Sequence, residues 1–411
     1  MIPREARVVI VGGGIAGASI AYHLAKLGWR NIVVLEQGEL VSGTTSHAPG
    51  LVGQLRSSVS LTKLLMDSVA LYRTLRANGE AGYFPVGSLR VASSQERFAE
   101  LQCQAKFAQQ VGLEAHLLGP VEAARRCPLM SLDGVEGALF VPGDGSATAT
   151  ILARTLIEEA QRLNVSFHDH VRVRAIEAPN GRIRAAETTD GRIEAETLVV
   201  AAGIWSPLIA RMVGVSLPLT PMQHQYVVTA PLPELASLTI ANLRDPDKLV
   251  YMRQRDDALV IGGYERTPRL FSVDAIPDRS DPTVQKFDAS HFEQLRRAMA
   301  ERVPCLATAE LAKGVNGLES FTPDGEFLLG PSREVRGFWA ACGFCAHGVS
   351  GAGGVGKALA EWIVTGQPSV DLSATVLDRF GTQAANPRFI DQGACRVYGT
   401  YYDLRRAEVA Q

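Results

Sequence analysis

The sequence predicts a mixed α/β fold in which a parallel sheet covered by helices is interleaved with a mostly antiparallel sheet. A strand, a glycine-rich turn, a helix and a second strand open the chain at residues 6–37. Short strands with hairpin turns fill much of the middle, and another strand, glycine-rich turn and helix follow near residues 337–366. Because parallel elements lie at both ends of the chain, we expect two interwoven domains rather than two domains in series.

Composition is that of an ordinary globular protein. The chain has 411 residues, of which 46% are hydrophobic and 20% charged, so it can build a large core. A net charge of −2 favours neither nucleic acid nor an anionic membrane, and no apolar run reaches the ~18 residues of a spanning helix. The start, MIPREARVVIVGGG, is unlike a signal peptide, and six cysteines in 411 residues make no disulfide framework. We expect a cytoplasmic protein with no nucleic-acid partner and no membrane insertion.

The opening segment has the periodicities of strand, helix and strand. Residues 8–11 (VVIV) form the continuous apolar run of a buried parallel strand. Apolar residues at helical spacing over 15–27 predict a helix that ends at Gly28, and residues 32–35 (IVVL) predict the second strand. Further helices are expected at 59–76, 95–111, 148–163 and 287–303.

Hairpin signals dominate the middle of the chain. PNGR and TDGR, within residues 166–203, are typical hairpin turns, and TLVVAAG at 197–203 returns the chain to a buried sheet. Residues 219–265 predict antiparallel strands, with RDD as one turn, and the final glycine-rich turn leads into a helix that ends at Gly366.

Three glycines follow the first strand and open the helix, in the pattern Gly12-x-Gly14-x-x-Gly17. The first permits the turn, the second lets a pyrophosphate approach the backbone, and the third lets the helix pack closely, while the helix N-terminus attracts negative charge. Glu36 ends the second strand, where it can accept hydrogen bonds from a ribose. Together these features predict a Rossmann-like dinucleotide site; a glycine turn made only for packing is the alternative.

Two more glycine-bearing segments lie far along the chain: LVVAAGIWS and residues 343–356. A simple NAD domain has no need of them. A flavin extends across the sheet and meets loops from the middle and the end of the chain, so these segments favour FAD over NAD.

Several segments, in the same order, resemble one family of flavoproteins. TTSHAPGLVGQ, PMQHQYVVT, YMRQ, NGLESFTPDGEFLLGP and CGFCAHGVSGAGG…GKALAEWI are similar to the amine- and amino-acid-oxidising FAD family, which includes D-amino-acid, glycine and sarcosine oxidases. The resemblance covers about residues 6–404 and is closest to the FAD halves of dimethylglycine dehydrogenase and oxidase, sarcosine dehydrogenase and methylaminobutanoate oxidase.

The resemblance implies a division of the chain into two discontinuous domains and a tail. The FAD-binding domain, of the glutathione-reductase type, is expected at 1–80, 145–217 and 312–380. The antiparallel substrate domain is expected at 81–144 and 218–311, and the C-terminal tail at 381–411 is a possible subunit contact.

The resemblance also implies that His47 carries the flavin covalently, through its 8α-methyl carbon. A neutral imidazole can add to the activated methyl group, and histidine is neutral at little cost near its usual pKa of about 6.5. A non-covalent contact is the alternative. In monomeric sarcosine oxidases the flavin is attached through a cysteine thioether instead. This attachment is excluded here, because the matching segment VNGLESFTPD contains no cysteine. The other residues expected to contact FAD are Gly12, Gly14, Gly17, Glu36, Ser46, Gly50, Leu51, Val173, Ala202, Gly203, Trp205, His347, Gly348 and Val349.

His224 and Tyr251 align with the histidine and tyrosine that face the substrate amine in dimethylglycine-type enzymes. We therefore expect a small secondary or tertiary N-methyl amine or amino acid, such as dimethylglycine or sarcosine, to lose hydride to flavin N5. The resulting iminium hydrolyses to formaldehyde and the demethylated amine. Both residues could instead be structural. Ser350 stands where sarcosine oxidases have a carboxylate-binding lysine, so the carboxylate partner is unassigned, with Arg253 and Arg56 as guesses.

Partners and rival functions stay open. The long relatives continue into a folate-binding domain, so we expect either a separate folate-binding or electron-accepting subunit or free release of the one-carbon unit. The rivals are α-carbon oxidation of a cyclic imino acid such as proline and an FAD-carrying electron-transfer or structural subunit. No metal site is expected: Cys342 and Cys345 lack further zinc ligands and favour packing near a ligand over a redox pair.

Overall fold

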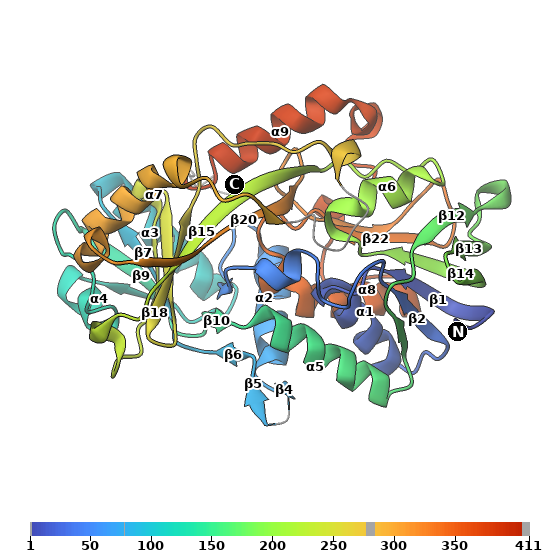
Figure 1. The fold of residues 1–411 in the computed structure, drawn as a ribbon, viewed down its shortest axis with the longest axis horizontal. Coiled ribbons are helices and arrows are strands. Elements are labelled where there is room, and N and C mark those ends of the chain that lie inside the picture. The colour runs from blue at the N-terminus through green and yellow to red at the C-terminus, as the bar shows by residue number, and fades with distance from the viewer. Residues whose placement is uncertain (1, 78, 277–283, 405–411) are drawn as a thin grey trace.

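A mixed sheet with a parallel centre and a larger, mostly antiparallel sheet lie at opposite ends of the long axis of the molecule (Figure 1). The structure is a computed structural model that describes residues 2–77, 79–276 and 284–404. The first sheet has the order β11 (Ser166–His168), β2 (Ile32–Leu35), β1 (Glu5–Val11), β14 (Gly191–Val200), β13 (Ala185–Thr188) and β12 (Val173–Glu177), and β22 (Phe338–Cys342) joins β14 and β21 (Leu328–Pro331).

Strand directions in this sheet agree with the sequence patterns. β1 is parallel to β2 and β14, and β22 is parallel to β14, so the strands from both ends of the chain meet here. All four residues of β2 are buried, as a continuous apolar run predicts. β12, β13 and β14 are antiparallel, and the turns between them contain the expected PNGR and TDGR segments, with Asn180 and Gly191 at positive φ.

Helices pack on this sheet and on one another. The helices nearest the site are α1 (Ile15–Lys26), α2 (Val59–Tyr72), α5 (Ala149–Arg162), α6 (Ser206–Arg211) and α8 (Gly348–Thr365). α8 contacts both α1 and α2, and α5 contacts α1. α8 ends with Gly366 in the left-handed conformation (φ 85°), which confirms the predicted end.

The second sheet is nine-stranded among the described residues. Its order is β19 (Val284–Gln285), β20 (Leu311–Phe321), β15 (Thr220–Thr229), β18 (Ala258–Gly263), β17 (Val250–Arg255), β16 (Asn242–Asp245), β7 (Ser88–Ala92), β9 (Gly137–Val141) and β8 (His116–Leu118). β17 and β18 form the hairpin whose turn was expected at RDD. α3 (Gln95–Gln110), α4 (Pro120–Arg126) and α7 (Ala289–Arg302) accompany this sheet (Figure 1).

Small strand pairs complete the fold. β3 (Leu51–Val52), β10 (Gly145–Ala147) and β6 (Tyr83–Phe84) form a three-stranded sheet, and β4 (Arg76–Ala77) pairs with β5 (Glu80–Ala81). The mixed α/β fold class is confirmed, whereas the domain boundaries stay predictions. Within the described residues, no helix is both long enough and apolar enough to cross a membrane.

A helix closes the C-terminal end of the described chain. α9 (Pro387–Gly399) lies across the top of the molecule in Figure 1 and contacts β15 and β20. No helix was expected here. The tail therefore packs on its own chain, and Tyr398 in α9 is buried with Met222 and Phe321. A subunit contact stays a prediction, and residues 405–411 lie outside the described part.

Candidate functional site

A cavity of about 1380 Å³ extends from the glycine fingerprint to the junction of the two sheets. Eleven of the residues expected to contact FAD line it: Gly12, Gly14, Glu36, Gly50, Leu51, Val173, Ala202, Gly203, Trp205, Gly348 and Val349. Gly17, Ser46, His47 and His347 do not line this cavity and are described below.

The fingerprint end fits a dinucleotide. Gly12 has φ 118°, and a Cβ atom there would lie 2.3 Å from the carbonyl oxygen of Ala201. A Cβ on Gly17 would lie 2.0 Å from the carbonyl oxygen of Gly12, so this glycine serves close packing. The Glu36 carboxylate accepts hydrogen bonds from the backbone amides of Gly13 (2.8 Å) and Gly38 (3.0 Å), while burial raises its pKa. The held carboxylate keeps lone pairs for a ribose hydroxyl.

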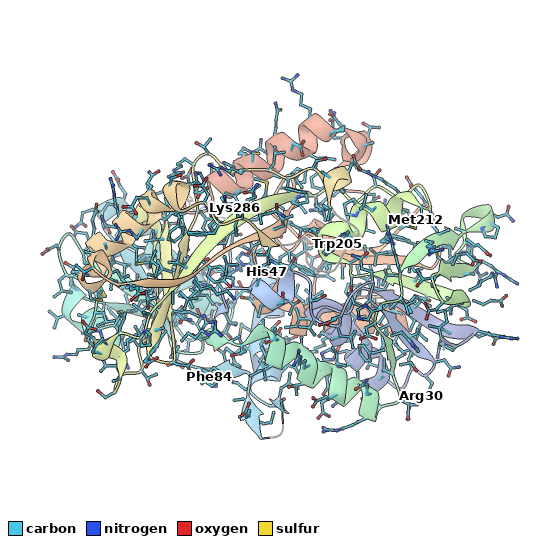
Figure 2. The ribbon with its side chains drawn as sticks, in the orientation of Figure 1. Arg30, His47, Phe84, Trp205, Met212 and Lys286 are labelled. Carbon is cyan, nitrogen blue, oxygen red and sulfur yellow. The ribbon has the colours of Figure 1, made fainter. Side chains whose placement is uncertain are left out.

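The loop that carries His47 is anchored to β20. Residues Thr44–His47 form a short 3₁₀ helix, and the Thr44 hydroxyl donates to the carbonyl oxygen of Leu318 (3.2 Å). The His47 imidazole is buried against Gly317, where an added Cβ would lie 2.4 Å from its Cδ2 atom. Figure 2 shows His47 near the middle of the molecule, between the two sheets. Ser46 is exposed, and its hydroxyl bonds only within the loop in the contacts described, to Ser42 and Gly43.

Two other residues of this loop, Thr45 and Ala48, line the cavity, so the loop borders it although the His47 imidazole does not line it. Arg253 holds the turn that follows: its Nε donates to the carbonyl oxygen of Pro49, and its Nη1 donates to that of Gln254 (3.1 Å). Arg253 lines neither this cavity nor the smaller pocket beside it. Its position supports a role in holding the loop, not in binding a substrate carboxylate.

A smaller pocket of about 390 Å³ adjoins the large cavity. The two share Pro49, Leu51, Glu319 and Ala346. The other residues that line the smaller pocket are Arg56, His224, Arg244, Tyr251, Tyr264, His347, Tyr401 and Tyr402. It therefore holds the two residues expected to face a substrate, next to the space that fits the flavin.

His224 is held between two tyrosines. Its Nε2 lies 2.7 Å from the Tyr251 hydroxyl and its Nδ1 lies 2.9 Å from the Tyr398 hydroxyl. Burial, with a smaller effect of His47, lowers the pKa of His224 to about 4, so the ring is neutral at neutral pH. Burial raises the pKa of Tyr251 well above 10. The structure brings the predicted pair together, and Tyr398 from α9 is a third member that the sequence did not indicate.

His347 belongs to the smaller pocket rather than to the cavity. Its Nδ1 accepts a hydrogen bond from Nη2 of Arg56 (3.1 Å), and its Nε2 lies 3.1 Å from the Tyr401 hydroxyl. Because arginine only donates, His347 carries its proton on Nε2 and donates it to Tyr401. Burial lowers the pKa of Arg56 to about 10, which still leaves it a cation. Arg56, a guessed carboxylate partner, therefore lines the pocket together with Arg244, which sequence reasoning missed.

Glu319 was also missed. It lies on β20, lines both cavities, and has a buried Oε2 with no hydrogen-bond partner among the described residues. Burial raises its pKa to about 7. The signal in the sequence was an acid inside the GLESF stretch of a strand.

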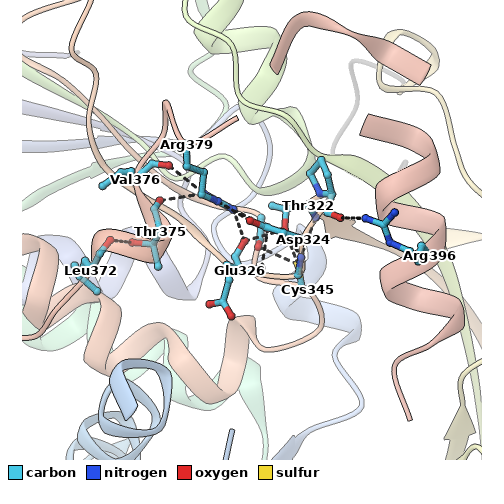
Figure 3. Close-up of polar contacts among 12 residues, drawn as sticks. Thr322, Asp324, Glu326, Cys345, Leu372, Thr375, Val376, Arg379 and Arg396 are labelled. Carbon is cyan, nitrogen blue, oxygen red and sulfur yellow. Dashed lines mark hydrogen bonds and ion pairs between the residues drawn. The ribbon is translucent and has the colours of Figure 1, made fainter. Parts of the chain in front are cut away.

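The TPDGEF turn after β20 fixes this strand to the end of the chain (Figure 3). The Thr322 hydroxyl donates to the carbonyl oxygen of Glu326 (2.8 Å), and Arg379 binds both oxygens of Asp324 (2.7 and 2.9 Å). Arg396 of α9 donates to the carbonyl oxygen of Pro323 (3.3 Å). The Cys345 thiol packs against Thr322 at 3.3 Å.

The cysteine pair shows no redox or metal features. Cys342 and Cys345 are buried free thiols whose pKa burial raises to about 12, which disfavours the reactive thiolate. Over residues 2–77, 79–276 and 284–404 no group of three or more His, Cys, Asp or Glu side chains is placed to hold a metal ion.

Comparison with known proteins identifies relatives along the whole chain. The chain is 37% identical to the mitochondrial sarcosine dehydrogenase of Mus musculus (98% of this chain, 44% of the relative) and 34% identical to the mitochondrial dimethylglycine dehydrogenase of Rattus norvegicus (92% and 45%). It is 32% identical to the mitochondrial pyruvate dehydrogenase phosphatase regulatory subunit of Mus musculus (98% and 46%). The chain thus spans about half the length of the curated relatives it matches.

Solved structures show the same fold. L-proline dehydrogenase from P. horikoshii superposes with a TM-score of 0.83 over 92% of this chain and 98% of that one, at 22% identity. Residues 7–362 match the family described as DAO, FAD dependent oxidoreductase. The glycine cradle, the terminal acid and the cavity between the two sheets are therefore those of a flavoprotein, and the chain belongs to the FAD-dependent oxidoreductase family.

Proposed function

We propose that this protein oxidises an N-methyl amino acid, such as sarcosine or dimethylglycine, to an iminium that hydrolyses to formaldehyde and the demethylated amine. The observation that carries the proposal is the smaller pocket, where neutral His224 and Tyr251 and the cations Arg56 and Arg244 adjoin the flavin cavity. Two relatives named sarcosine and dimethylglycine dehydrogenase support the substrate class.

The cofactor site fits FAD, which when bound supplies the hydride acceptor. The backbone around Gly12 and Gly14 would hold the pyrophosphate, and Glu36 a ribose hydroxyl. His47, fixed between Gly317 and the turn held by Arg253, is the residue we propose for covalent attachment.

The residues of the smaller pocket would bind and orient the amino acid. Arg56 and Arg244 would take the carboxylate, since a guanidinium presents several donors to it. Arg56 has an N–H donor available for this carboxylate, because its buried Nε has no hydrogen-bond partner among the described residues. The neutral His224–Tyr251 pair would lie near the amine, and stacked Tyr264 and Tyr401 (ring centroids 3.8 Å apart) would exclude water. An environment of neutral rings favours the uncharged amine, whose lone pair the oxidation requires.

An amine screen tests the proposal. Holoenzyme is mixed anaerobically with sarcosine, dimethylglycine, 4-methylaminobutanoate and proline, and both flavin bleaching and formaldehyde are measured. We expect bleaching with formaldehyde from the N-methyl compounds. His224→Asn and Tyr251→Phe should each slow bleaching by about 10- to 100-fold and change its pH dependence. Bleaching that both variants leave untouched across pH would refute their roles.

A second candidate is a flavin-bearing subunit without amine oxidation. The relative named as a pyruvate dehydrogenase phosphatase regulatory subunit favours it. The same screen separates the possibilities: no bleaching by any amine supports the subunit, and bleaching by proline without formaldehyde supports oxidation of a cyclic imino acid. A cytoplasmic location and a separate folate-binding or electron-accepting subunit stay predictions.

A further inference from the structure

Glu319 stands where the flavin cavity and the smaller pocket meet. On β20 it is paired with Met222 of β15, two positions from the pair formed by Gly317 and His224. Residues two apart on a strand point to the same face, so Glu319 lies on the face that Gly317 presents to His47. The carboxylate is thus on the site side of the sheet, and it lines both cavities.

The described residues leave one oxygen of this carboxylate unsatisfied. Its Oε2 is buried without a hydrogen-bond partner. A buried ionisable group without a partner is costly, and such groups in folded proteins call for a functional explanation.

Charge is divided within the smaller pocket. Glu319 lies at the side shared with the flavin cavity, whereas Arg56 and Arg244 line the smaller pocket only. A zwitterionic amino acid carries the complementary charges: its carboxylate suits the arginines and its ammonium suits Glu319. This arrangement would also direct the nitrogen toward the flavin side.

We propose that Glu319 is the counter-ion of the substrate ammonium group and the acceptor of its proton. The inference rests on the proposed function. In the step, the N–H bond of the ammonium breaks, its electron pair stays on nitrogen as the lone pair, and the proton forms an O–H bond with the Glu319 carboxylate. The products are a neutral amine and a neutral carboxylic acid, and nothing is oxidised or reduced. The neutral amine is the form whose N-methyl carbon can lose hydride.

The surrounding groups leave Glu319 as the acid–base group of this step. The titratable or charged residues that line the two cavities or lie on the elements packed on β20, α9 included, are Glu36, His47, Arg56, Arg172, His224, Tyr226, Arg244, Tyr251, Tyr264, His347, Arg388, Asp391, Cys395, Arg396, Tyr398, Tyr401 and Tyr402. Burial raises the pKa of Tyr251, Tyr264 and Tyr398 well above 10, so these phenols stay neutral, as does His224. With its pKa raised by burial to about 7, Glu319 can both hold and release a proton near neutral pH.

Two ligands of the same shape test the charge directly. Glycine betaine carries a permanent cation and no N–H, whereas 3,3-dimethylbutanoate has a carbon atom in place of that nitrogen. Binding to holoenzyme is measured by calorimetry at a pH above 8 for wild type, Glu319→Gln and Glu310→Gln, an exposed acid beside β20. We expect Glu319→Gln to weaken the binding of betaine by at least about tenfold, and to change the affinity for dimethylbutanoate by no more than about twofold. Glu310→Gln should change neither.

The pH profile tests the proton transfer. For an N-methyl amino acid, kcat/KM of the wild type should rise with pH through about 7, as Glu319 loses its proton. In Glu319→Gln this rise should vanish, and activity should recover only at more alkaline pH, where free amine exists in solution.

Each outcome decides one question. The counter-ion role is refuted if Glu319→Gln changes the affinity for both ligands equally. It is also refuted if the wild type binds betaine no more tightly than dimethylbutanoate. If kcat/KM of Glu319→Gln still rises with pH through about 7, Glu319 is not the proton acceptor. If no N-methyl amino acid bleaches the flavin while betaine binding still depends on Glu319, the proposed function fails and the cation site stands.

Discussion

His47 and Gly317 come from chain segments about 270 residues apart, yet a side chain at Gly317 would collide with the His47 imidazole. The imidazole fills the space in which a side chain on Gly317 would lie. This contact fixes the ring from one side, and the turn held by Arg253 fixes the loop from the other. Held from both sides in this way, the imidazole can keep one ring nitrogen in a fixed position beside a cofactor.

Gly317→Ala should therefore displace the imidazole, since the new Cβ would lie 2.4 Å from Cδ2 of His47. If His47 carries the flavin, acid precipitation of Gly317→Ala and of His47→Ala should release most of the yellow colour into the supernatant. It should stay with the wild-type pellet. Gly119→Ala is the matched control, because nothing lies within 4 Å of a Cβ there. Wild-type protein that releases its flavin on precipitation would contradict the covalent link.

Single residues differ in how far sequence can predict them. The roles of Gly12, Gly17 and Glu36 follow from local spacing, because strand, turn and helix together build that end of the site. Arg244 gives no such signal, and Glu319 gives only that of a single acid in a strand. An arginine and an acid in strands are ordinary surface residues until the fold shows which cavity they line.

Among the elements, α9 differs most from expectation. Its sequence contains Gly393 and Gly399, which lower helix propensity, so PRFIDQGACRVYG gives a weak helical pattern. Packing requires the first of these glycines, since a Cβ on Gly393 would lie 2.6 Å from Pro323. β7 and β9 were also not expected, because short buried strands are hard to separate from loops by periodicity. The long helices with clear apolar spacing, such as α1 and α8, were predicted close to their observed ends.

Tyr398→Phe tests the contribution of α9. The change removes the hydroxyl that lies 2.9 Å from Nδ1 of His224 and leaves a buried ring nitrogen without this partner. We expect about 1–3 kcal/mol less free energy of unfolding, measured by chemical denaturation of holoenzyme. Tyr22→Phe in α1 is the control and should stay within about 0.5 kcal/mol. Equal small effects would mean that the His224–Tyr398 contact adds nothing to stability.

For the whole molecule, the site lies where the two sheets meet, and its buried charge has a stability cost. Burial raises the pKa of Glu319 from 4.5 to about 7, so the native state holds this proton more tightly than the unfolded chain. Stability from this group is present below pH 4.5 and is lost as pH rises through about 7. His23 and His224, whose pKa burial lowers to about 4, act in the opposite direction: their stability is lost as pH falls from 6.5 toward 4.

Glu319→Gln should isolate the first effect, because variant and wild type share the two histidines. The Tm of the variant minus that of the wild type should increase as pH rises from about 5 to 8. Differential scanning calorimetry of the two holoenzymes measures it, with Glu310→Gln expected to show a flat difference. A difference for Glu319→Gln that does not change with pH would contradict the raised pKa.

The tyrosines of the C-terminal end also bear on where this protein can be cut. The family match stops at residue 362, whereas Tyr398, Tyr401 and Tyr402 lie beyond it. A fragment trimmed to the matched span would keep every residue of the glycine cradle but lose one wall of the smaller pocket and uncover Met222 and Phe321. Such a fragment would retain a place for the cofactor without a closed place for the amine. A boundary drawn from the family match alone would therefore be the wrong one for transferring this site to another protein.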